Sequence, residues 1–143
     1  YNTGRGGKIT WHGPGQRIIY FIINLKKRSI DVRKFVNNIE NFIITSLKDL
    51  KINAYKKDGM IGIWTLDKYK KEAKISSLGL RVSSGIIYHG VSLNVSCDLS
   101  NFHNIEACGI KNSRVTSIND LNLFIKNEIV DNTLKRNLNL IFN

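Results

Sequence analysis

The amino-acid sequence predicts an α+β fold, and three observations predict it. Apolar residues follow helical spacing from residue 32 to residue 50, and they do so again from 119 to 142. Between these stretches, residues 52–66 and 73–95 hold short runs rich in β-branched residues, separated by glycine-containing turns. Helix, hairpins and helix in this order indicate an α+β architecture. No internal repeat or proline-rich linker divides the chain, so we expect residues 1–143 to form one domain.

A glycine-rich loop opens the chain and leads into a strand. Four glycines between residues 6 and 15 surround Trp11 and His12. Bare backbone of this kind lets a ligand approach closely, although a plain turn before a strand has the same composition. The stretch "RIIYFIINL", residues 17–25, is β-branched and aromatic, and it predicts a buried strand.

A long helix is predicted next. Ser29 or Asp31 can cap a helix that runs to about Leu50. One stripe of this helix is expected to face the core, through the apolar residues Val32, Phe35, Val36, Ile39, Phe42, Ile43, Leu47 and Leu50.

Two hairpins are predicted in the middle of the chain. "INAYKK" and "IGIWTL" flank a turn at Asp58, and "AKISSLGLRV" and "IIYHGVSLNV" flank residues 83–85. Side chains alternate between the two faces of a strand. The third of these segments is therefore expected to place Lys74, Ser76 and Leu78 on one face and Ile75, Ser77 and Gly79 on the other.

The last third of the chain is predicted to be a loop followed by a helical tail. Residues 97–116 indicate a loop region. From 119 to 142 the apolar residues recur at helix-like intervals, and we expect a break near Asp131 and Asn132.

The formal net charge of +11 favours an acidic partner, either nucleic acid or protein. The lysines are scattered, and no arginine-rich arm or aromatic ribbon accompanies them, so a nucleic-acid-binding module remains the weaker of these two alternatives. The apolar runs are far shorter than a bilayer span, and none opens the chain as a secretion signal would. We therefore expect a cytoplasmic protein that does not bind membranes.

Several classes of site do not match the sequence. It contains neither a G-x-x-x-x-G-K-[ST] phosphate loop nor a G-x-S-x-G elbow. "HGPG" is not a metal-ligand spacing, so we expect no zinc site, although one can be drawn from the scattered residues His12, His89, Cys97 and Cys108. Two cysteines without an export signal make no disulfide framework, and both are expected to be thiols.

The remaining candidate for chemistry is a thiol. Cys108 lies in "IEACGIK", where the following glycine lets the backbone approach a ligand. A cysteine is a strong nucleophile as the thiolate, which a nearby cation stabilises, and Lys74 is the candidate cation. Taken alone, each has a plain structural explanation, because cysteines are often small buried residues and strand lysines often reach solvent. Cys97 adjoins Asp98, which disfavours a thiolate there.

Four motifs in order give these residues a context. "RGGKITWHGPGQRIIY", "KISSLGLRV", "YHGVSLNV" and "ACGI" after "DLSNFHNI" closely resemble the motifs of the lipoyl(octanoyl) transferases. The resemblance covers residues 5 to about 120. It implies a biotin/lipoate ligase-like fold, which is a mixed β-sheet flanked by helices.

The resemblance also implies an activity and a set of site residues. The family moves an octanoyl group from octanoyl-acyl carrier protein to a lysine of lipoyl domains, in 2-oxoacid dehydrogenase complexes and glycine cleavage H protein, with no cofactor or metal. Cys108 is expected to carry the acyl thioester, and Lys74 to stabilise its thiolate and shuttle protons. Contacts to the acyl chain are expected from Arg5, Gly6, Gly7, Lys8, Ile9, Thr10, Trp11, His12, Ser77, Leu78, Gly79, Gly90, Val91 and Ser92.

The sequence departs from the family pattern in two ways. Trp11 stands where tyrosine is common, so it offers an N–H donor and no hydroxyl acceptor. Members usually carry a further segment before R-G-G, whereas four residues precede it here, so we expect the fold to lack an N-terminal segment. An ATP-dependent lipoate or biotin ligase on the same scaffold is the main alternative, since such enzymes need no nucleophilic thiol.

Overall fold

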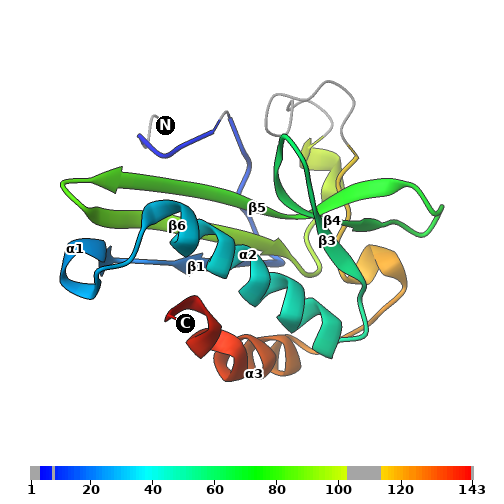
Figure 1. Ribbon diagram of the computed structural model, residues 1–143. Helices are drawn as coiled ribbons and strands as arrows, with labels where there is room; N and C mark the ends of the chain where they lie inside the picture. The colour runs from blue at the N-terminus through cyan, green and yellow to red at the C-terminus, as the bar shows by residue number, and fades with distance from the viewer. Residues whose placement is uncertain (1–3, 8, 103–113, 143) are drawn as a thin grey trace.

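The computed structural model describes residues 4–7, 9–102 and 114–142. Within these residues, six strands form one sheet, and the helices α2 and α3 pack together on one side of it (Figure 1). Residues 4–7 and 9–15, which precede β1, run along the other side (Figure 1). The predicted α+β class, a mixed sheet with helices, is confirmed.

The sheet follows the order β1-β6-β5-β4-β3, with β2 paired to β6 as well. All of these strand pairs are antiparallel, and a parallel bridge joins Lys74 to Val115. The strands are β1 (Gln16–Tyr20), β2 (Ile23–Asn24), β3 (Ala54–Lys57), β4 (Met60–Leu66), β5 (Glu72–Ser83) and β6 (Ile86–Asn94). Both predicted hairpins are confirmed.

The predicted continuous strand over residues 17–25 is wrong. The ladder with β6 is interrupted at residues 21 and 22, opposite His89, whose φ of 64° lies outside the β region. Leu25 begins a short helix, α1 (Leu25–Arg28), because the Asn24 side chain accepts a hydrogen bond from the Lys27 amide and caps it.

The predicted long helix is confirmed as α2 (Val32–Asp49). Its N-cap is Asp31, whose carboxylate accepts hydrogen bonds from the backbone amides of Arg33 and Lys34. Ser29 instead ends α1 with a φ of 51°. The apolar stripe faces the core as predicted, except that Val32 at its start is exposed and Val36 is half-buried outside the core cluster.

The helical tail begins later than predicted. Residues 119–121 and 138–142 form the 3₁₀ turns η3 (Asn119–Leu121) and η4 (Leu138–Phe142), and α3 spans Asn127–Asn137. The break expected near Asp131 is wrong, because Asp131 lies inside α3 and accepts hydrogen bonds from Arg17 of β1 at 2.5 and 3.2 Å. This ion pair ties the helix to the edge strand.

A bulge in β5 corrects the predicted alternation around Lys74. Trp64 pairs with Lys74 and Ile63 with Ser76, so Ile75 is an extra residue between two ladder positions. A bulge shifts the alternation by one residue. Ile75 therefore points into the core, and Lys74 shares the opposite face with Ser77 and Gly79.

The core lies between the sheet and the two helices. Its fully buried side chains come from α2, from the inner face of β4, β5 and β6, and from the C-terminal tail: Phe35, Ile39, Phe42, Ile43, Leu47, Ile63, Ile75, Ile87, Leu93, Ile118 and Ile141. This packing fixes the central strands, of which β5 and β6 form part of the cavity wall described below.

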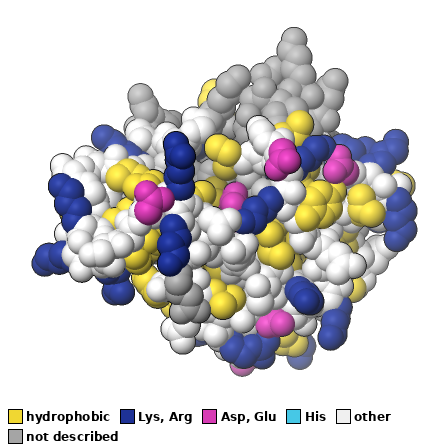
Figure 2. Space-filling model, viewed as in Figure 1, with side chains coloured by type: hydrophobic (Ala, Val, Ile, Leu, Met, Phe, Trp, Pro, Cys, Tyr) yellow, Lys and Arg dark blue, Asp and Glu magenta, His cyan; other side chains and the backbone are white. Residues whose placement is uncertain are grey.

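Lysine and arginine side chains are dispersed over the face of the molecule in Figure 2, in separate groups with hydrophobic side chains between them. Among the described helices, none has the length and apolarity needed to cross a membrane.

Candidate active site

A cavity lies between the N-terminal loop and strands β1, β5 and β6. Apolar side chains, glycine backbone and a few polar groups line it, as is typical of small-molecule sites. Its lining residues are Arg5, Gly7, Ile9, Thr10, His12, Ile18, Tyr20, Ser77, Leu78, Gly79, His89, Gly90, Val91 and Ser92.

Three separate sequence motifs meet at this cavity. Most of the residues predicted to contact an acyl chain lie in its wall: Arg5, Gly7, Ile9, Thr10, His12, Ser77, Leu78, Gly79, Gly90, Val91 and Ser92. Gly6 and Trp11 do not line it, and Lys8 and Cys108 lie outside the described residues. Ile18 and Tyr20 were missed, yet they pair directly with Ser92 and Gly90 in the ladder. The pairing of β1 with β6 identifies these two residues, but the sequence alone does not give that register.

The second half of the glycine loop has a structural role. Gly15 has a φ of 86°, and its carbonyl accepts hydrogen bonds from the amides of Val95 and Ser96 at 3.1 and 2.9 Å. Gly6 is similarly close to β5, donating its amide to the Leu80 carbonyl. The loop is thus attached to the sheet at both ends, which positions the residues between them over the cavity.

Trp11 packs beside the cavity rather than in its wall. Its ring lies edge-on to Phe102 with 5.6 Å between centroids. It also covers Gly13, where a Cβ atom would come within 2.2 Å of the indole. The tryptophan therefore anchors η1 (Leu99–Phe102), the last described segment before Cys108, to the glycine loop.

Two glycines lie side by side in the neighbouring strands that form the cavity floor. Gly79 of β5 and Gly90 of β6 are partners in the ladder. A Cβ atom at Gly90 would lie 1.7 Å from the Ile19 carbonyl oxygen, whereas one at Gly79 would meet the flexible side chain of Arg5 at 3.2 Å. Gly90 thus permits the close approach of β1 to β6, and Gly79 leaves the floor open.

Lys74 is a buried lysine without a compensating charge in the described structure. It is 1% exposed, and Nζ has no hydrogen-bond partner among the described residues. Nζ lies 4.9 Å from the centre of the Trp64 ring, a cation–π contact. Gly62, with a φ of 124°, makes room for it, since a Cβ atom there would be 3.0 Å from Lys74 Cε. A buried amine of this kind indicates a functional group, because burial of an unpaired charge is costly.

Residues 114–116, which follow Cys108 in sequence, lie beside Lys74. The Lys74 amide donates to the Arg114 carbonyl at 2.8 Å, and the Thr116 amide donates to the Lys74 carbonyl at 2.9 Å. Residues 114–116 thereby occupy the position next to β5 that β6 leaves when it ends at Asn94.

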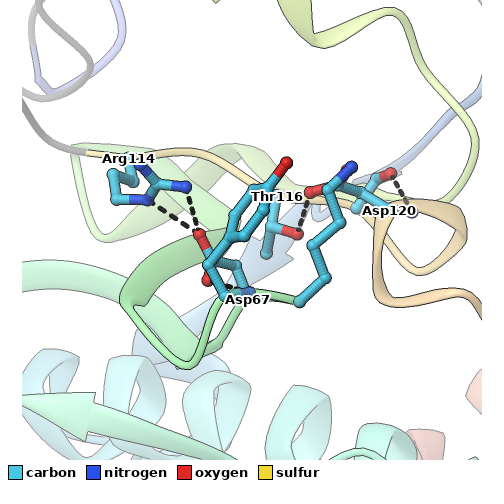
Figure 3. A network of polar contacts seen from close by, with 7 residues as sticks. Asp67, Arg114, Thr116 and Asp120 are labelled. Carbon is cyan, nitrogen blue, oxygen red and sulfur yellow. Dashed lines mark hydrogen bonds and ion pairs between the residues drawn. The ribbon is translucent and has the colours of Figure 1, made fainter.

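An ion pair holds this segment in place. The Arg114 guanidinium donates to Asp67 Oδ2 from Nε at 2.7 Å, and Asp120 accepts from the Thr116 hydroxyl at 3.0 Å (Figure 3). Burial raises the pKa of the Asp67 carboxyl, but hydrogen bonds from the Lys71 amide, Arg114 and the Tyr69 amide outweigh it. The pKa of Asp67 is therefore below its usual value of 3.8.

The depressed pKa of Asp67 predicts an acid-sensitive contribution to stability. A carboxylate with a lower pKa in the folded state stabilises the fold above its unfolded pKa, near 4, and this stabilisation is lost as the pH falls through the folded value. Asp67→Asn should cost about 2 kcal/mol at pH 7 and clearly less at pH 3. Urea unfolding at the two pH values measures this, with the exposed Asp58→Asn as the control. An equal loss at both pH values would contradict the assignment.

Cys97 is not suited to be a nucleophile. It is buried, and burial raises the pKa of its thiol to about 11. The backbone of residues 96 and 97 packs directly on Gly15. Cys97 therefore has a structural role. This agrees with the sequence, in which the adjoining Asp98 disfavours a thiolate.

This fold, with its cavity between a glycine-rich loop and the strands of the sheet, is that of a known family of catalytic domains. The model of the family "Lipoyl protein ligase A/B catalytic domain" matches residues 1–138, and the chain belongs to this family. It is 44% identical over 142 residues to an octanoyltransferase of Rickettsia canadensis, covering 98% of this chain and 68% of the relative. It is 41% identical to an octanoyltransferase of Bartonella bacilliformis, covering 99% and 62%. The resemblance to the lipoyl(octanoyl) transferases, a class of acyltransferases, is confirmed.

Solved structures show the same fold. A bipartite lipoate protein ligase from Thermoplasma acidophilum superposes with a TM-score of 0.69 at 16% identity, over 96% of this chain and 55% of the other. A biotin protein ligase from Aquifex aeolicus gives a TM-score of 0.62 at 15% identity, over 89% and 53%. The predicted biotin/lipoate ligase-like fold is confirmed. The chain spans about two-thirds of the curated relatives and about half of these structures.

Proposed function

We propose that this chain transfers an octanoyl group from octanoyl-acyl carrier protein to a lysine of a lipoyl domain, through a thioester on Cys108. The observation that carries the proposal is the convergence of the glycine loop, the Ser77–Gly79 stretch and the Gly90–Ser92 stretch around one cavity. The relatives that share these motifs are octanoyltransferases. The proposal therefore extends their named activity to this chain.

The cavity suits an acyl chain. Ile9, Ile18, Leu78 and Val91 provide apolar contacts, and the glycine floor lets the chain lie against backbone. Burial of each methylene contributes about 0.8 kcal/mol, so an eight-carbon chain gains several kcal/mol from such a site. Polar groups at the rim, among them Arg5 and His12, are available to the polar end of the substrate.

Chain connectivity supports Cys108 as the partner of Lys74. Cys108 is six residues from Phe102, which contacts Trp11, and six from Arg114, which is hydrogen-bonded beside Lys74. Six residues span at most about 20 Å, so the chain on either side of Cys108 is long enough for the thiol to reach the cavity and the buried amine. Cys97 has no comparable access, because it is buried under the glycine loop.

The residue types account for the chemistry. A lysine ammonium at position 74 stabilises the Cys108 thiolate, which attacks the octanoyl thioester carbonyl. A new carbon–sulfur bond forms, the bond to the carrier's pantetheine sulfur breaks, and the ammonium can protonate that leaving sulfur. One thioester replaces another, so the step needs no ATP. The amine of the acceptor lysine then attacks the acyl-enzyme, forming the amide and releasing Cys108.

The partners fit the charge of the protein. Carrier proteins and lipoyl domains of this kind are typically acidic, and a chain with a formal net charge of +11 attracts acidic surfaces. The expected acceptors are lipoyl domains of 2-oxoacid dehydrogenase complexes and glycine cleavage H protein. Charge of this type raises the association rate, and its effect declines with salt.

The experiment is to incubate the protein with octanoyl-acyl carrier protein and measure its mass. One octanoyl group should be added, hydroxylamine should remove it, and peptide mapping should locate it on Cys108. Cys108→Ala should remain unmodified, whereas Cys97→Ala should be modified like the wild type. Acylation of the Cys108→Ala protein would contradict the nucleophile, and ATP-dependent loading of free lipoate by that variant would favour a ligase instead.

A further inference from the structure

A buried row of side-chain amides joins the cavity to the segment beside Lys74. His12 Nδ1 lies 3.1 Å from Gln16 Oε1, Gln16 Nε2 donates to Asn94 Oδ1 at 2.9 Å, and Asn94 Nδ2 donates to the Thr116 carbonyl at 3.0 Å. Gln16 and Asn94 are 8% and 3% exposed, and Thr116 is fully buried. A buried polar row of this kind carries a direction, because each amide has one acceptor end and one donor end.

The direction is fixed at the Thr116 carbonyl. A carbonyl oxygen only accepts, so Asn94 must turn its NH₂ group toward it and its Oδ1 toward Gln16. Gln16 must then present its NH₂ group to Asn94 and its Oε1 to His12. A reversal of either amide would oppose two oxygens or two NH₂ groups in a buried place, which is costly. The Gln16 oxygen therefore faces His12 Nδ1, so whenever the imidazole carries a single ring hydrogen, that hydrogen is on Nδ1.

This leaves Nε2 of His12 with a lone pair. The His12 side chain lines the cavity, so its second ring nitrogen is available to a substrate as a hydrogen-bond and proton acceptor. With the opposite tautomer, Nε2 would be a donor and could not accept a proton. The amide row thus selects the form of His12 that can act as a base.

We propose that Gln16 and Asn94 are positioning residues that hold His12 in the Nδ1–H tautomer, so that Nε2 accepts the proton of the attacking lysine amine. The inference rests on the proposed function, whose second half-reaction needs a base. As the carbon–nitrogen bond forms, the amine proton moves to Nε2, and the carbon–sulfur bond breaks to return Cys108 as a thiolate. The imidazolium then gives its proton to that thiolate or to solvent, and all charges balance.

The different roles proposed for Lys74 and His12 agree with their different surroundings. Lys74 is enclosed and acts on sulfur, whereas His12 is exposed at the cavity, where an acceptor lysine on another protein has to arrive. Thr116 connects them, since its amide is bonded to the Lys74 carbonyl and its own carbonyl orients the amide row.

The tautomer is tested by ¹⁵N NMR of labelled histidine, which distinguishes protonated from unprotonated ring nitrogens without any catalytic turnover. We expect Nδ1–H in the wild type and in Gln16→Glu, whose carboxylate still accepts from Nδ1, and loss of that preference in Gln16→Leu. Asn137→Leu is the matched control, because this amide bonds Ser46 and Asp49 on the helical side. It should leave the His12 signals unchanged. A preserved Nδ1–H signal in Gln16→Leu would overturn the proposal.

The chemical role is tested by separating the half-reactions. The enzyme is loaded with octanoyl-acyl carrier protein, and transfer to a lipoyl domain is then timed. Gln16→Leu should slow transfer by roughly tenfold or more, and His12→Phe by roughly 10²-fold or more, and in each variant transfer should be slowed more than loading is. His12→Phe changes an exposed side chain, so it remains informative if the buried variant fails to fold. Equal slowing of loading and transfer would overturn the inference. Failure of the wild type to load would refute the proposed function and leave the tautomer measurement standing.

Discussion

Lys74→Met is expected to slow acylation of Cys108 by about 10²–10⁴-fold, and the protein should be at least as stable as the wild type. The two effects have one origin, because the amine is fully buried without a hydrogen-bond partner in the described part of the chain. Methionine fills a similar volume and has no charge to desolvate, so the free energy of unfolding should rise by about 1 kcal/mol or stay unchanged. The acylation rate is therefore expected to fall, whereas the free energy of unfolding is not.

The control for this variant is Lys57→Met. Lys57 also lies over the Trp64 ring, at 5.4 Å, but it is more exposed and paired with Glu72. Its loss should cost less than about 1 kcal/mol and leave acylation unchanged. Acylation rates by mass spectrometry and unfolding in urea give both quantities. If Lys74→Met destabilised the protein by several kcal/mol while loading normally, Lys74 would be a structural residue.

The second large effect is expected on stability, from Gly90→Ala. The new methyl group would meet the Ile19 carbonyl at 1.7 Å, and that oxygen belongs to a strand that cannot rotate away. Strand β1 would have to separate from β6, at a cost of about 3 kcal/mol or more. Because both strands line the cavity, acyl binding should be lost as well.

Gly79→Ala is the matched comparison, since Gly79 is the ladder partner of Gly90. Its methyl group would meet the end of a flexible arginine at 3.2 Å, and the backbone is not in the left-handed region. We expect a change below about 1 kcal/mol. Thermal unfolding of both variants measures the difference. Similar melting temperatures for the two would show that the close β1–β6 contact does not require glycine at position 90.

Sequence patterns predicted the elements whose signal is local. The α2 helix was identified from its stripe and its Asp31 cap, and both hairpins from their turns. Errors arose where a partner from elsewhere decides the conformation. The strand predicted over 17–25 is interrupted because of His89 on β6, and Asp131 stays in a helix that it anchors to Arg17.

The site was predictable where a residue belongs to a motif. Arg5, Ser77 and Gly90 are distant in sequence and meet at the cavity, and the resemblance named all three. The residues that support the site were missed. The contacts of Trp64 and Asn94 depend on the bulge at Ile75 and on the docking of residues 114–116. Neither feature leaves a periodic pattern or a residue spacing in the sequence. Gly62 within "IGIW" was the one available signal, since a glycine inside a strand often marks close approach.

The paired glycines of the floor also bear on substrate choice. Gly79 and Gly90 contribute backbone to the cavity wall, and backbone does not change size when a sequence diverges. A Cβ atom at position 90 would overlap the Ile19 carbonyl, whereas one at position 79 would meet the Arg5 side chain at 3.2 Å and the Gly6 carbonyl oxygen at 3.7 Å. Under the proposed function, position 79 is therefore the place where a single replacement should narrow the cavity and change the length of acyl chain that binds.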